Sequence, residues 1–172
     1  MLLLATWRVK ESCFKLVDKV ISQIRFEVEQ VDRLFVSYAD LLEQVQRKSP
    51  DLVKVTAVAS VLHSFYNGLE SIFLVIAKRI DQDVPEGAQW HRDLLTRMME
   101  KTSSRGPVLT VGTVHQLANY LGFRHFYRHS YSFFLDWDEL EELVMPLSEI
   151  WEQTKGEILQ FLNNLDQPSE AK

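Results

Sequence analysis

Apolar residues recur every three or four positions over most of this chain, and this spacing constrains its fold more than any other feature. From about Lys10 to Arg47 the pattern follows the 3.6-residue period of one long amphipathic helix. The same period returns in the later segments, and no stretch alternates apolar and polar side chains as a half-buried strand does. The pattern therefore predicts an all-α fold.

Start and stop signals divide the remainder into four further helices. Ser49 and Pro50 are expected to serve as N-cap and first-turn proline of a helix that runs to about Ile80. A shorter helix is expected over 88–101. Thr113, with Gln116 at capping-box spacing, predicts the start of the next helix, which should end near 131–134.

Asp136 is the expected N-cap of the last helix, over about 137–165, which Pro146 is expected to bend. Short connections favour an antiparallel arrangement of these five helices. We expect one helical domain over residues 1–165, followed by a disordered tail at 166–172.

Length and composition narrow the class of protein. With 172 residues, 46% of them apolar, the chain has enough material for one substantial core. No stretch reaches the roughly 20 apolar residues that a membrane span needs, so we expect a cytoplasmic protein with no membrane contact. The single cysteine, Cys13, predicts neither an internal disulfide nor a zinc knuckle.

The charge is distributed unevenly along the chain. The net charge of −5 argues against a general nucleic-acid binder. Residues 88–131, however, carry a net charge of +4 and four of the five histidines, whereas residues 132–172 carry −8. A basic centre of this kind can attract a polyanion locally, although solvated helix faces would show similar scatter.

The predicted functional site is the stretch LGFRHFYRHSY, residues 121–131. Arg124, Arg128 and Tyr131 are spaced as one line along a helix. A second line holds two small residues and then two histidines: Ala118, Gly122, His125 and His129. Small residues allow another helix to approach closely.

These side chains suit phosphate chemistry without a cofactor. A histidine such as His129 can take the proton from a ribose 2′-hydroxyl, and the guanidinium of Arg124 can hold phosphate oxygens. Such cleavage leaves a 2′,3′-cyclic phosphate. His125 and His129 also have the spacing of two metal ligands, but no third ligand accompanies them, so no metal site is predicted.

The second helix carries a polar line beside its apolar stripe, formed by His63, Asn67 and Glu70. It can orient a catalytic group from a neighbouring helix or simply face water. His91, at the start of the third helix, is a weaker candidate for a phosphate contact and is expected to be exposed.

Helix geometry separates the two proposed catalytic groups. Five residues place His129 roughly 140° around the helix from Arg124. A second copy packed across the Ala118 and Gly122 line would solve this, because each site could then combine groups from both chains.

The sequence RHFYRHSY, from Arg124 to Tyr131, resembles the Arg-x-x-x-x-His-x-Tyr motif of the HepT-like toxins, a branch of the HEPN superfamily of helical ribonucleases. The flanking GFRH, the run FYNGLES at 65–71 and WHRDLLTRM at 90–98 also resemble stretches of that family.

The resemblance implies a homodimeric all-α ribonuclease toxin of a type VII-like toxin–antitoxin pair, whose composite site uses Arg124 and His129 on RNA. It also implies a nucleotidyltransferase (MNT-domain) antitoxin that blocks the site by adding AMP to Tyr131. Many HEPN nucleases have a small polar residue after the motif arginine. His125 stands there in this chain, either as a second acid/base group or as a mark of altered activity.

The alternative is a non-catalytic HEPN subunit that holds or presents a nucleotide to such a transferase. If the protein is a ribonuclease, five further residues are expected to support the site or bind RNA: His125, Arg128, Asn67, Glu70 and His63.

Overall fold

The computed structural model describes residues 2–166, with side chains from residue 17 onward except that of Phe133. The predicted tail over 166–172 lies outside these residues apart from Asp166, which ends the last helix. Cys13 lies outside the described side chains.

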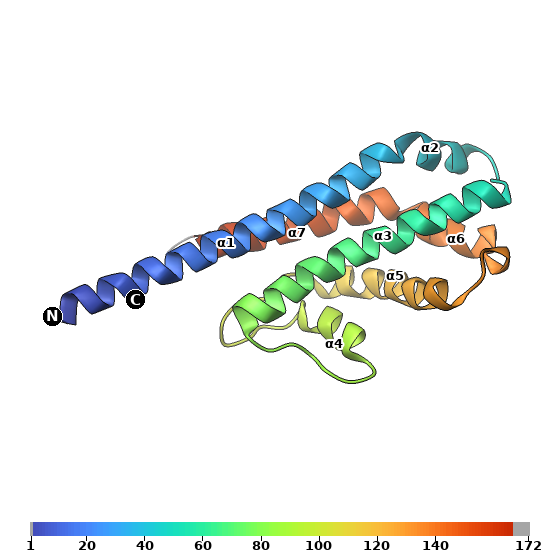
Figure 1. Cartoon of the computed structure of the whole chain (residues 1–172). Coiled ribbons are helices and arrows are strands. Elements are labelled where there is room, and N and C mark those ends of the chain that lie inside the picture. The colour runs from blue at the N-terminus through green and yellow to red at the C-terminus, as the bar shows by residue number, and fades with distance from the viewer. Residues whose placement is uncertain (1, 167–172) are drawn as a thin grey trace.

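The described chain is an all-α bundle, as predicted, built around α3 (Leu52–Ile76) (Figure 1). α3 packs against α1 (Leu2–Ser37) on one side and α5 (Val111–His129) on the other. α7 (Leu147–Asp166) lies along α1 and also contacts α5. More than half of the α3 side chains are buried, because it has neighbours on several sides.

Shorter elements complete the bundle. α2 (Ala39–Arg47) and α6 (Trp137–Val144) contact α3, and α4 (Trp90–Arg97) packs against both α3 and α5. A π-helical turn, η1 (Ala77–Asp81), extends α3, and a 3₁₀ turn, η2 (Ser132–Phe134), follows α5.

Two predicted helices are each divided in two. The first breaks at Tyr38 (φ −113°, ψ 14°), although the bond from Tyr38 N–H to the Leu34 carbonyl continues the helical ladder. The last divides at Pro146, as the expected bend there implied, because proline has no N–H to continue the α6 ladder.

Two predicted N-caps were wrong. Asp51, not Ser49, caps α3 by accepting a 2.9 Å hydrogen bond from the Lys54 N–H. Thr110, not Thr113, caps α5, and its hydroxyl accepts from the Thr113 N–H. In both cases a nearby residue of equal capping ability stood in the favourable extended conformation.

Aromatic side chains tie α1, α3, α5 and α7 together. The Trp151 ring stacks on Phe35 at 6.2 Å and meets Phe65 edge-on at 6.1 Å, and Phe65 in turn meets Tyr120 at 5.3 Å. The Trp151 indole donates to Asp32 on α1 at 2.8 Å. These contacts fix the axial position of α5 relative to α3, which positions the site.

A buried ion pair holds the connection that leads into α5. Arg105 donates to both carboxylate oxygens of Asp81, at 2.9 and 2.8 Å, and the two side chains are 0% and 4% exposed. The same guanidinium donates to the carbonyls of Arg97, Glu100 and Gly106. Sequence patterns gave no indication of this anchor.

The 30 residues from Leu52 to Asp81 have the length and composition of a membrane span, contrary to the expectation that no stretch would. Within the structure, 61% of their most apolar window is buried, as in the core helix of a bundle.

Candidate functional site around Arg124

Arg124 lies on the face of α5 that packs against α3, and it is only 6% exposed. Its Nε donates to Asn67 Oδ1 at 2.8 Å, and its Nη2 donates to Glu70 Oε1 at 2.8 Å. Asn67 and Glu70 are three residues apart on α3, so they present two acceptors to one guanidinium. The fork of Arg124 is therefore held in one orientation.

His91 extends this network to α4. Its Nδ1 bonds to Glu70 Oε2 at 2.5 Å, and its Nε2 lies 3.5 Å from Arg124 Nη1. A carboxylate accepts, so Nδ1 carries a proton, and Nε2 is then oriented to accept from the guanidinium. The expectation of an exposed His91 was wrong, because the ring is 9% exposed and stacks on Trp90.

His63 lies on the other side of Asn67. Asn67 Oδ1 accepts from Arg124, so its Nδ2 donates to His63 Nε2 at 2.9 Å. His63 is therefore neutral, with its proton on Nδ1, a buried atom with no partner among the described residues. Burial lowers the pKa of His63, and Arg124 and Arg128 lower it further.

His125 and its neighbours at the end of α5 are exposed. The His125 ring meets His91 edge-on at 5.2 Å, while Arg128 and His129 also face solvent. The pKa of His125 is lowered by partial burial, then by His91 and Arg124. Among the described contacts of Arg124 are Asn67, Glu70 and His91 but not His129.

Tyr131 does not continue the helical line of Arg124 and Arg128, which corrects the predicted alignment. α5 ends at His129, and Ser130 (φ −105°, ψ 148°) and Tyr131 (φ −81°, ψ 149°) are extended. Tyr131 is 70% exposed. Basic residues in the last turn suit the negative end of the helix dipole, so ending at His129 is favourable.

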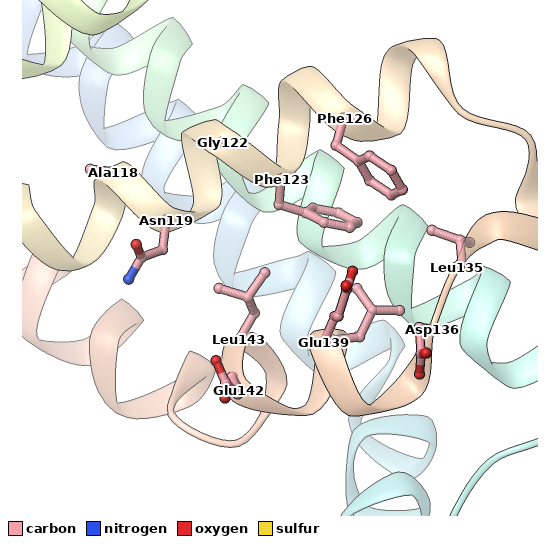
Figure 2. A pocket seen from close by; sticks show the side chains of 11 residues that line it. Ala118, Asn119, Gly122, Phe123, Phe126, Leu135, Asp136, Glu139, Glu142 and Leu143 are labelled. Carbon is pink, nitrogen blue, oxygen red and sulfur yellow. The ribbon is translucent and has the colours of Figure 1, made fainter.

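Two hollows flank the exposed Ala118 and Gly122 on α5, and both residues line both hollows. One, of about 490 Å³, lies between α5 and α6 and is lined by Asp136, Glu139 and Glu142 (Figure 2). The other, of about 410 Å³, lies between α4 and α5 and reaches His91 and His125.

Reasoning from the sequence missed His91 as a member of the network, although a signal was available. His91 precedes Leu94 and Leu95 by three and four residues, which places it on the buried face of α4. The same periodicity that predicted those leucines inward applies to the imidazole. Among the described residues, no cluster of three His, Cys, Asp or Glu could hold a metal ion.

A protein-family model described as HepT-like protein matches residues 57–165, well over half of the chain. The chain belongs to this HepT-like family. The match begins within α3 and ends in α7, so it includes every residue of the Arg124 network. No curated protein and no solved structure matched the chain.

Proposed function

We propose that this HepT-like protein is a ribonuclease toxin that cleaves RNA with Arg124 and His129. The observation that carries the proposal is the fixed guanidinium of Arg124, held by Asn67 and Glu70 beside three exposed basic side chains on one helix end. A preorganised cation needs no rearrangement when negative charge develops on a phosphate.

The proposed chemistry uses the RNA's own nucleophile. A neutral His129 takes the proton of the 2′-hydroxyl, the 2′-oxygen bonds to phosphorus, and the bond to the 5′-oxygen breaks. The products are a 2′,3′-cyclic phosphate and a free 5′-hydroxyl, which receives a proton. Arg124 and the exposed Arg128 would stabilise the charged phosphate oxygens. No cofactor takes part in these steps.

A second copy of the chain would complete the site. His129 lies roughly 140° around α5 from Arg124, so the two side chains of one protomer do not face the same phosphate. The exposed Ala118 and Gly122 would let another helix approach closely. Packing there would bring His129 of the second copy towards Arg124 of the first, and monomers would be inactive.

Tyr131 is the proposed point of control by an antitoxin with a nucleotidyltransferase domain. Its 70% exposure suits a side chain that must enter another enzyme's active site. Its phenolic oxygen would bond to the α-phosphorus of ATP, the α–β anhydride bond would break, and pyrophosphate would leave as the phenol loses its proton. The added adenylate is bulky and negative, so it would obstruct the end of α5 and offset nearby arginines.

One observation favours the alternative, a non-catalytic subunit that holds a nucleotide for such a transferase. The Arg124 side chain is 8% exposed and already paired with Glu70. A guanidinium neutralised in this way has less charge to offer a phosphate, so Arg124 would then be structural.

The deciding experiment is cleavage of a labelled RNA pool in EDTA by the wild-type protein and by His129→Ala. We expect wild-type products with cyclic phosphate ends and none from the variant. Gln116→Ala, which removes an exposed polar side chain nearer the start of α5, is the control and should still cleave. A folded, unmodified dimer that cleaves nothing would favour the non-catalytic subunit.

A further inference from the structure

Apart from Ala118 and Gly122, where a second copy would approach, the residues that line the hollow between α4 and α5 have no role in the steps described above, yet the hollow adjoins the Arg124 network. Its volume of about 410 Å³ is within the range of pockets that hold small ligands. His91 lines it and also bonds to Glu70 and approaches Arg124. A ligand in this hollow would therefore lie next to the guanidinium.

The two hollows beside α5 differ in the charge of the residues that line them. Arg92, His115 and His125 line the α4–α5 hollow, and no carboxylate is among the described residues that do. The α5–α6 hollow has the opposite character, with three carboxylates at Asp136, Glu139 and Glu142 (Figure 2). An anionic ligand is therefore attracted to one side of α5 and repelled from the other.

The remaining lining suits a nucleobase. Leu95, Met99 and Leu121 form an apolar wall, against which the flat face of a base can lie. Gln89 and Thr96 add side chains that both donate and accept hydrogen bonds, as the edge of a base requires. The hollow thus combines the cationic Arg92 and imidazole side chains for a phosphate with apolar and polar groups for a base.

The field inside the hollow supports the same conclusion. The pKa of His125 is lowered by burial first and then by His91, Arg124 and Arg128, whereas Glu70 acts in the opposite direction. The region around His125 is thus one in which adding positive charge is unfavourable. Burial disfavours charge of either sign, so only the contribution of the positive neighbours Arg124 and Arg128 favours an anion there.

We infer that the α4–α5 hollow binds one nucleotide of the RNA chain, adjacent to the phosphate that Arg124 faces. Arg92 and His115 contact the backbone phosphate, and the wall of Leu95 and Met99 holds the base. This inference rests on the proposed ribonuclease function for the identity of the ligand as RNA.

Binding to a non-cleavable RNA tests the hollow separately from catalysis. The probe is a short fluorescent oligoribonucleotide with every 2′-hydroxyl methylated, which removes the nucleophile. Its affinity for the full-length protein is measured by anisotropy. Arg92→Ala and His115→Ala each remove an exposed side chain, so folding should be retained. We expect each to weaken binding by roughly fivefold or more.

The matched control is Arg79→Ala, which removes one exposed arginine that lines a different hollow, beside α1. It should change the affinity by less than about twofold, since its charge is remote and screened. On cleavable RNA, Arg92→Ala and His115→Ala should raise KM by a similar factor and leave kcat within about twofold.

The outcomes separate the two proposals. If the wild type cleaves RNA and both variants keep the wild-type KM and affinity, nucleotide binding in the hollow is overturned and the ribonuclease function stands. If the oligoribonucleotide binds tightly, both variants weaken its binding and the unmodified wild type does not cleave RNA, nucleotide binding in the hollow is supported and the ribonuclease function is overturned. Equal weakening by Arg79→Ala would mean non-specific charge attraction, which also overturns the hollow.

Discussion

Glu70 Oε1 lies 2.8 Å from Arg124 Nη2, and this ion pair joins α3 to α5 where both side chains are at most 10% exposed. The other oxygen of the same carboxylate bonds to His91 Nδ1. One carboxylate thus holds a guanidinium and an imidazole from two different helices. Removing it would leave Arg124 as a buried charge without its counter-ion.

Glu70→Gln should therefore destabilise the protein and abolish the proposed cleavage. Breaking a buried pair by removing one partner costs about 3 kcal/mol or more, which urea unfolding would measure. Glu142→Gln, on the exposed face of α6, is the control and should change stability by less than about 0.5 kcal/mol. The double variant Glu70→Gln/Arg124→Met should recover part of the loss, and a fully additive loss would contradict the pairing.

Helical periodicity explains why part of this site could be predicted. The spacing of His63, Asn67 and Glu70 fixes them on one side of α3, wherever that helix packs. The spacing of Ala118, Gly122, His125 and His129 likewise fixes one exposed line on α5. Local geometry of this kind follows from the sequence alone.

The contact of Arg124 on α5 with the polar line of α3 could not be predicted in the same way. Arg124 and Glu70 are 54 positions apart, and their contact depends on the axial position of α5 along α3. That position is set by core contacts such as Phe65 with Tyr120. The helix end at His129 was also missed, because Ser130 and Tyr131 carry no glycine or proline signal that would mark it.

The neutral state of His63 predicts a pH dependence. Because the pKa of His63 is lowered from 6.5 in the folded protein, the unfolded chain binds more protons just below that value. Stability should therefore fall as the pH falls below about 6.5. His63→Gln keeps an acceptor for Asn67 but cannot take up a proton, so its stability should depend less on pH over this range. An unchanged slope in urea unfolding would contradict the assignment.

The close packing of α3 against Val31 of α1 predicts a steric effect at Gly68. A Cβ added to Gly68 would lie 2.6 Å from Val31 Cγ2, so the Val31 side chain or one of the two helices must shift. Gly68→Ala should cost about 1–3 kcal/mol, and Val31→Ala in the same chain should relieve part of that cost. Gly156→Ala in α7, where an added Cβ meets nothing within 4 Å, is the control and should stabilise by about 0.5–1 kcal/mol. Equal effects at the two glycines would contradict the close approach.

Glu157 on α7 holds the first turn of α5 and predicts a second pH dependence. Its carboxylate accepts from the Thr110 N–H at 2.8 Å and from the Thr113 hydroxyl at 2.7 Å. Burial alone would raise the pKa of Glu157, but these bonds outweigh it and lower the pKa below 4.5.

The stabilisation by Glu157 is therefore present above about pH 4.5 and is lost as the pH falls through the lower pKa that Glu157 has in the folded protein. Near pH 7, Glu157→Gln should lower the free energy of unfolding by about 1–2 kcal/mol relative to the wild type. At acid pH the difference should be small, because Glu157 of the wild type is then also protonated. Glu149→Gln, an exposed carboxylate on the same helix, is the control in urea unfolding at both pH values. A loss that stays equal from neutral to acid pH would show that the charge of Glu157 does not hold α5.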